Sequence, residues 1–212
     1  MKIWFTSDTH YWHKNIIQYS NRPVEGIEAM NALLIKNWQE RVKEDDLVYH
    51  LGDFFFCGAV KAAAILKQLP GRKIWIRGNH DSKVNTLGYF FEEVTHYKMI
   101  YVDIPYEDEE EKPQVYHQPI VLFHFPIASW DGMAHGSWHL HGHCHGSFPD
   151  NGSLRMDVGV DCWNMSPVSV EEITKEMVMR TVVPVDHHDK RENNPRFKHL
   201  LKIANYASRS NL

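Results

Sequence analysis

Five short groups of polar residues within positions 8–145 carry side chains that bind divalent metal ions. Each group holds aspartate, asparagine or histidine, most of them beside a turn, and the groups are Asp8-Thr9-His10, Gly52-Asp53, Gly78-Asn79-His80-Asp81, His124 and Gly142-His143-Cys144-His145. Mixed carboxylate, amide and imidazole donors suit Mn, Fe, Ni or Zn better than Ca or Mg alone. A carboxylate such as Asp53 can bridge two ions, which then clamp the attacking and leaving oxygens of an in-line displacement. The sequence therefore predicts a two-metal site.

Each group by itself also has a plain structural interpretation. Asp, Thr and Gly-Asn are common in turns, and a lone histidine after an apolar run, such as His124, is more often structural than a ligand. A single zinc site built on residues 141–145 would leave Asp8, Asp53 and Asn79 without a role. The number and order of the groups favour two metals over these alternatives.

The apolar runs before these groups predict the elements that position them. Strands and helices are expected to alternate over residues 2–6, 24–44, 47–51, 59–69 and 73–76. This order predicts a parallel sheet with helices on its face. Asp8, Asp53 and Asn79 each follow one of the strands. Because functional groups gather beyond the carboxyl ends of such strands, these side chains should converge on one rim.

The second half of the chain has a different pattern. Short apolar runs separated by turns, which predict hairpins, cover residues 97–104, 115–124, 137–142 and 154–160. The acidic residues 107–111 are expected to form a solvated hairpin loop. Ser169 and Glu172 have the spacing of a capping box, which predicts a last helix from about residue 169. Residues 182–185 could form a closing strand.

One domain is expected over residues 1–185, followed by a polar tail at 186–212. Residues 196–207 of this tail could form a loosely docked peripheral helix, and the role of the tail is left open. A chain of 212 residues is long enough for one sizeable core.

Composition and charge narrow the function classes. Apolar residues make up 43% of the chain and charged residues 24%, as in ordinary globular proteins, and 15 residues are histidines. The formal net charge of −4 gives no electrostatic case for binding long duplex DNA. The three cysteines, without a Cys-x-x-Cys pair, argue against a disulfide framework and fit a cytoplasmic location. We expect neither a signal peptide nor a membrane span.

The ordered motifs resemble the calcineurin-like metallophosphoesterase superfamily. Its signature runs Asp-x-His, Gly-Asp-x-x-Asp-Arg, Gly-Asn-His-Asp/Glu, His and Gly-His-x-His, and the likeness covers residues 8–145. The segments 8–17 and 21–23, with the later segments 158–164 and 167–169, look like a small bacterial and phage branch of predicted phosphoesterases.

The resemblance implies a fold and a set of roles. The fold would be α/β, a two-sheet β-sandwich flanked by helices in four layers, with the metals at its rim. One ion would be held by Asp8, His10, Asp53 and His145, and the other by Asp53, Asn79, His124 and His143. His80 would stabilise the transition state or protonate the leaving oxygen.

The sequence departs from the signature after Gly52-Asp53. Phe56 and Cys57 stand where the family has an aspartate that orients the catalytic histidine and an arginine that holds phosphate. We therefore expect Asp81 or another carboxylate to orient His80. The expected substitutes for the phosphate contact are His13, Asn15, Arg22 and Arg77.

Aromatic residues near the motifs have two interpretations. Residues 54–56, all phenylalanine, could be core or an apolar wall that accepts a base or acyl group. Trp4 and Trp75 are expected in the core, whereas Trp12 and Trp163 are left open between core and stacking on a nucleobase.

These features predict a phosphoester hydrolase that uses two divalent ions, with Mn as first choice and Fe, Ni or Zn as alternatives. The favoured activity is a phosphodiesterase on a nucleotide-like or nucleic-acid substrate, by in-line attack of a metal-bound hydroxide. Alternatives are a phosphomonoesterase, including a Ser/Thr protein phosphatase, and a non-catalytic metal-binding scaffold. The substrate, the metal and the oligomeric state are left open.

Overall fold

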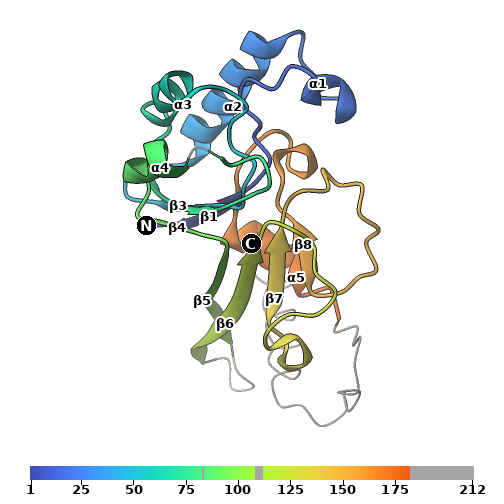
Figure 1. Cartoon of the computed structure of the whole chain (residues 1–212). Coiled ribbons are helices and arrows are strands. Elements are labelled where there is room, and N and C mark those ends of the chain that lie inside the picture. The colour runs from blue at the N-terminus through green and yellow to red at the C-terminus, as the bar shows by residue number, and fades with distance from the viewer. Residues whose placement is uncertain (83, 108–111, 182–212) are drawn as a thin grey trace.

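The computed structural model describes residues 1–82, 84–107 and 112–181, and these form two mixed β-sheets packed face to face with flanking helices (Figure 1). The expected α/β sandwich is therefore confirmed. The predicted closing strand at 182–185 and the tail at 186–212 lie outside the described residues, as does most of the predicted acidic loop at 107–111.

The first sheet contains the predicted parallel strands. Its strand order is β4-β3-β2-β1-β9, and the strands are β1 (Ile3–Thr6), β2 (Leu47–His50), β3 (Arg72–Ile76), β4 (Glu93–Thr95) and β9 (Val168–Ser169). β1 to β4 are parallel and β9 is antiparallel to β1. β4 and β9 are too short to give a clear sequence pattern, and the prediction missed both.

Helices cover one face of this sheet. They are α1 (Ile16–Tyr19), α2 (Ile27–Arg41), α3 (Ala59–Leu66) and α4 (Val84–Leu87), followed by the 3-10 turn η1 (Gly88–Phe90). α2 buries Met30, Leu34 and Trp38, whose spacing of four residues places them on one helix face. It is shorter than the predicted 24–44 because Gly26 precedes it with a φ of 98° and Val42 is extended. Figure 1 shows α2 and α3 on the side of this sheet away from the second sheet.

The second sheet corrects the expected row of hairpins. Its strand order is β5-β6-β7-β8, and the strands are β5 (Tyr97–Glu107), β6 (Pro113–Phe123), β7 (Trp138–His141) and β8 (Arg155–Asp157). Only β5 and β6 form an antiparallel hairpin, whereas β6, β7 and β8 run parallel. Short β-branched and aromatic runs predict strands but do not determine their direction. The parallel direction matters here because it brings the carboxyl ends of β6, β7 and β8 to the same edge.

Two apolar clusters hold the layers together. One lies between the sheets and includes Phe5, Ile76, Ile120 and Leu140. The other lies between the first sheet and its helices and includes Trp4, Trp38 and Trp75, which confirms the two tryptophans predicted in the core. Successive strand residues point to opposite faces, so Trp4 and Phe5 enter different clusters.

The last helix begins as predicted. In α5 (Val170–Met177), the Ser169 hydroxyl accepts a hydrogen bond from the Glu172 N–H and the Glu172 carboxylate accepts one from the Ser169 N–H. Two further 3-10 turns, η2 (Met133–His135) and η3 (Val160–Cys162), lie in the loops after β6 and β8. In the described part of the chain, no helix combines the length and the apolar character needed to cross a bilayer.

Candidate metal centre

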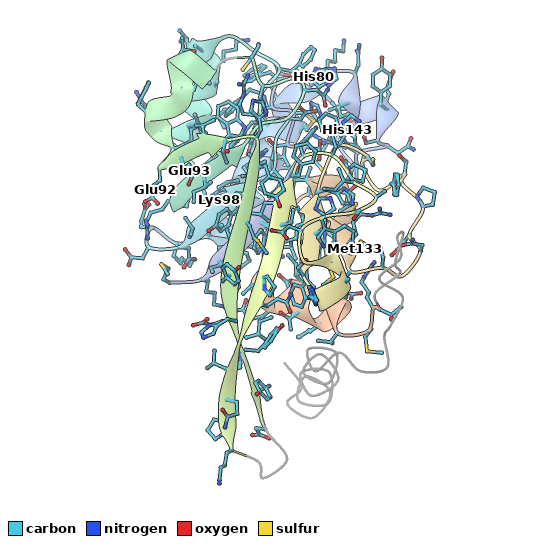
Figure 2. The ribbon with its side chains drawn as sticks, turned by 60° about the horizontal axis from the view of Figure 1, so that its bottom comes forward. His80, Glu92, Glu93, Lys98, Met133 and His143 are labelled. Carbon is cyan, nitrogen blue, oxygen red and sulfur yellow. The ribbon has the colours of Figure 1, made fainter. Side chains whose placement is uncertain are left out.

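The predicted ligands follow the carboxyl ends of five strands and meet at one rim of the sandwich. Asp8 and His10 follow β1, Asp53 follows β2 and Asn79 follows β3 in the first sheet, while His124 and the pair His143/His145 follow β6 and β7 in the second. Figure 2 shows His80 and His143 at the same end of the molecule, opposite the tip of the β5–β6 hairpin. Both sheets therefore contribute to one site.

The acidic and imidazole ligands fall into two groups. Asp8, His10 and His145 form one, and Asp53, His124 and His143 form the other, with candidate donor atoms within 4.8 Å of one another in each group. In the first group the Nε2 atoms of His10 and His145 both lie 3.9 Å from Asp8 Oδ1.

Asp53 lies between the two groups. Its Oδ2 atom is 3.6 Å from His10 Nε2 and 3.5 Å from His124 Nε2. One carboxylate oxygen thus faces a donor from each group, which is the position of a bridging ligand. The side-chain oxygen of Asn79 is 3.0 Å from both His124 Nε2 and His143 Nδ1, so it belongs with the second group.

Buried donor atoms without partners show that the site fits metal ions. Asp8 Oδ1 and both ring nitrogens of His10 are buried and have no hydrogen-bond partner among the described residues. Leaving such a group unpaired costs roughly 1–3 kcal/mol. Two divalent ions would occupy these donors, and the mixed oxygen and nitrogen set matches the borderline ions predicted from the sequence.

The backbone at the ligands is in an unusual conformation. Five of the predicted ligands have a left-handed φ between 48° and 70°: Asp8, His10, Asp53, His143 and His145. Non-glycine residues adopt this conformation at a cost, and it clusters at functional sites. Gly142 is required by close approach, because a Cβ there would lie 2.2 Å from Asp8 Oδ2.

Burial sets the electrostatics of the ligands. It raises the pKa of Asp8 to about 7 and lowers the pKa of His10 to about 3, because each charged form is poorly solvated. Burial also acts to raise the pKa of Asp53, but hydrogen bonds from His124 and the His80 N–H, with the charge of His124, hold it below its usual range. Asp53 is thus kept as a carboxylate between the two groups.

Arg22 is a correction to the predicted phosphate contacts. Its guanidinium is buried and donates to the carbonyl oxygens of Asp8 (2.6 Å) and Thr9 (2.9 Å). It also forms a two-point ion pair with Asp161, at 2.8 and 2.9 Å. With its donors used inside the protein, Arg22 braces the Asp8–His10 segment and does not face a substrate.

Asp161 was not predicted as a site residue. Its Oδ2 accepts a 2.6 Å hydrogen bond from His145 Nδ1, which leaves His145 Nε2 facing Asp8. Burial acts to raise the pKa of Asp161, but hydrogen bonds from His145 and Arg22 hold it below its usual range. Similarly, His124 Nδ1 donates to the Leu51 carbonyl at 2.7 Å. Such outer contacts fix ring orientation and tautomer. The only sequence signal for Asp161 was its place in the segment 158–164.

Asp81 is also a correction, because it does not orient His80. Its Oδ2 accepts hydrogen bonds from the N–H groups of Asp53, Gly78 and Trp75 (indole), and its Oδ1 accepts one from Phe54 N–H. The carboxylate is buried, and its hydrogen bonds hold together the two loops that carry Asp53 and Asn79. His80 instead lies near Asp53, with its Nε2 4.0 Å from Asp53 Oδ2.

The ligands open into a cavity of about 630 Å³. His80 and His13 line it, so His13 stays a candidate substrate contact. Asn15 is exposed at the start of α1 and is not among the lining residues. Arg77 is turned to His96 and to the Asp81 carbonyl and does not line the cavity either.

The phenylalanine run divides between the two predicted roles. Phe54 and Phe55 are buried in the core, whereas Phe56 is 48% exposed and lines the cavity. Trp12 is half-buried beneath the ammonium group of Lys61, 3.9 Å from its ring centre, and Trp163 lines a separate cavity. Neither tryptophan is among the residues that line the cavity of the candidate ligands.

Comparison with known proteins agrees with this geometry. The sequence model of calcineurin-like phosphoesterases matches residues 1–199. An uncharacterized protein of Methanocaldococcus jannaschii is 34% identical over 195 residues, which cover 85% of this chain and 96% of that protein. The gene 66 protein of Mycobacterium phage L5 is 30% identical over 80% of this chain and 91% of its own length. Among solved structures, a protein of unknown function from Aquifex aeolicus aligns with a TM-score of 0.59 at 26% identity, over 82% of this chain and 98% of that one.

Proposed function

Because this chain belongs to the calcineurin-like phosphoesterase family, we propose that it is a phosphodiester hydrolase that works with two divalent metal ions. The observation that carries the proposal is the place of Asp53, whose Oδ2 lies between His10 of one ligand group and His124 of the other. This arrangement fits two ions that share a carboxylate.

The positions of these residues suggest which ion each of them would bind. Asp8, His10 and His145 would hold one ion, Asn79, His124 and His143 would hold the other, and Asp53 would serve both. When bound, the two ions supply the Lewis acidity and the activated water for an in-line displacement at phosphorus. The donor set supports Mn as first choice, with Fe, Ni or Zn as alternatives.

His80 is placed to act on the substrate. Its side chain is 44% exposed at the cavity, and its backbone N–H donates to Asp53 Oδ1 at 2.9 Å. The backbone contact fixes the residue beside the bridging carboxylate while the ring stays free to reach into the cavity. We assign His80 to hydrogen bonding with the phosphoryl group or to protonation of the leaving oxygen.

The charge of the cavity favours a diester over a monoester. None of the described residues that line it is lysine or arginine, because Arg22 is buried behind the ligands and Arg77 is turned away. A phosphomonoester carries a charge of about −1.5 to −2 at neutral pH. A phosphodiester carries a single negative charge and needs fewer cations. The aromatic residues that line the cavity support a nucleotide-like substrate. The cytoplasmic location of the protein stays a prediction.

The test is a metal screen with paired esters. Hydrolysis of bis-p-nitrophenyl phosphate and p-nitrophenyl phosphate is measured with Mn, Fe, Ni, Zn and Mg for the wild type, Asp53→Asn and His80→Ala. We expect metal-dependent turnover of the diester that is lost in Asp53→Asn, which removes the bridging charge. In His80→Ala the two ions should still bind while turnover falls.

Two other outcomes would contradict the proposal. A clear preference for the monoester with every metal would make the protein a phosphomonoesterase. Stoichiometric binding of two ions without turnover of either ester would favour a non-catalytic metal-binding scaffold.

A further inference from the structure

A row of aromatic rings leads from the outer part of the cavity to His80. Tyr19, His13 and Phe56 line the same cavity as His80. Ring centres are 6.4 Å apart between Tyr19 and His13, 4.0 Å between His13 and Phe56, and 5.6 Å between Phe56 and His80. Two separate chain segments therefore form one surface, which we call the aromatic shelf (Tyr19, His13 and Phe56).

Two rings of the shelf are exposed, although the two phenylalanines directly before Phe56 are buried. Tyr19 is 71% and Phe56 48% exposed, whereas Phe54 and Phe55 are 0% and 5% exposed. The core thus takes two of three consecutive phenylalanines, and the third is turned into the cavity. Exposed aromatic rings that adjoin a site of polar groups are a common feature of ligand-binding surfaces.

The shelf is fixed to the metal ligands. His13 N–H donates to the His10 carbonyl at 2.9 Å, and Ile16, one turn before Tyr19, is buried in the core. A group that lies on the shelf is therefore held at a set position relative to His10 and His80. The shelf contributes no lysine or arginine, so its chemistry suits a flat, uncharged group rather than a second phosphate.

We propose that the aromatic shelf is a base-stacking subsite, which takes the nucleobase joined through its sugar to the scissile phosphate. Every base has a flat face that stacks on Phe, Tyr or His rings, so such a subsite accepts nucleotides of different sequence. The inference rests on the proposed diesterase function and narrows its substrate to nucleoside phosphodiesters. A substrate with an alkyl group in place of the base would gain no stacking.

Binding tests the shelf without turnover. Titration calorimetry of the Mn-loaded protein compares AMP with ribose 5-phosphate, which has the same phosphate and sugar but no base. We expect AMP to bind roughly 5- to 150-fold more tightly, the usual range for stacking one base. Phe56→Leu keeps the apolar bulk and removes the ring, so it should weaken AMP binding and leave ribose 5-phosphate within about twofold. Tyr101→Ala, which truncates a 67% exposed tyrosine on β5, is the matched control and should change neither.

Hydrolysis separates failure of the shelf from failure of the proposed function. The substrates are thymidylyl-thymidine and its analogue without bases, and faster turnover of the first is expected. Equal affinities for AMP and ribose 5-phosphate, with equal turnover of both diesters, would contradict base stacking on the shelf. The proposed hydrolase activity would still stand. Base-dependent binding without turnover of any diester would support the shelf and contradict the hydrolase. An equal effect of Phe56→Leu on both ligands would also overturn the shelf.

Discussion

The imidazole of His145 and the carboxylate of Asp161 are joined by a 2.6 Å hydrogen bond from Nδ1 to Oδ2. The same carboxylate pairs with Arg22, which also holds the carbonyl oxygens of Asp8 and Thr9. Asp161 therefore connects the two chain segments that carry Asp8, His10 and His145, the candidate ligands of one ion, although it lies outside this group itself.

Replacing Asp161 should weaken one metal site and spare the other. In Asp161→Asn we expect roughly 10- to 100-fold weaker binding of one of the two Mn ions, the usual effect of losing such an orienting contact. Calorimetry with Mn would resolve the two sites. Asp150→Asn is the matched control, since Asp150 also pairs with an arginine (Arg180, 2.7 Å) but lies away from the ligands. Unchanged affinity at both sites in Asp161→Asn would contradict the orienting role.

Replacing Asp81 should lower stability, because its carboxylate accepts four N–H groups in the interior. In Asp81→Ala these buried donors lose their partner, and we expect a loss of about 3 kcal/mol, or roughly 6–12 °C in Tm. Thermal unfolding of the metal-free protein measures this. His80→Ala is the contrast, since its exposed ring should change Tm little while kcat/KM falls roughly 100- to 10,000-fold. A wild-type Tm in Asp81→Ala would show that these four hydrogen bonds do not contribute to stability.

Metal removal should destabilise the fold. Asp8 Oδ1 and both ring nitrogens of His10 are buried without a hydrogen-bond partner among the described residues, and bound ions would satisfy them. Mn at a hundred times its Kd should add about 2.7 kcal/mol, or roughly 5–10 °C in Tm, relative to protein in chelator. Differential scanning fluorimetry measures the shift, and Asp53→Asn should reduce it. An equal Tm with and without metal would exclude tight binding to the native state.

Acid should destabilise the fold through His139, a buried residue of β7 that is not among the candidate metal ligands. Burial lowers its pKa from 6.5 to about 3. Between these values the unfolded chain binds a proton on this imidazole and the folded protein does not, so stability falls as the pH drops through that window. The loss should reach roughly 2 kcal/mol at about pH 5.

Urea unfolding in chelator at pH 7.5 and 5 measures this loss. His139→Asn should reduce the difference between the two pH values, even if it lowers stability at both. Burial also holds the pKa of His50 well below its usual value, so part of the acid effect should remain in the variant. An unchanged difference would exclude His139 as a source.

The features that were predicted correctly depend on residues that are close together in sequence. The motifs Gly-Asn-His-Asp and Gly-His-Cys-His could be recognised from the sequence, because the predicted ligands and the turns that expose them are neighbours in sequence. The strands of β1, β2 and β3 and the capping box of Ser169 also depend on residues a few positions apart, and these predictions agree with the structure.

The predictions that were wrong concern partners distant in sequence. Arg22 was expected to face substrate, but it meets Asp161, which is 139 positions away. Asp81 or another carboxylate was expected to orient His80; Asp81 instead accepts from Asp53, 28 positions away, and the carboxylate near His80 is that of Asp53. Nothing in the local sequence indicates which buried polar groups will take Arg22 and Asp81 as hydrogen-bond partners. Those groups become buried, and so require partners, only when the loops pack together.

The sequence by itself determined the ligand types, their order and the alternating elements of the first sheet, since periodicity and turn chemistry are local properties. Only the tertiary structure decided that β6, β7 and β8 run parallel, which brings His124 and His143 to the rim that already carries Asp8 and Asp53. It also decided that Phe56 faces the cavity while Phe54 and Phe55 fill the core. Strand direction and burial depend on packing between distant segments, which no run of residues specifies alone.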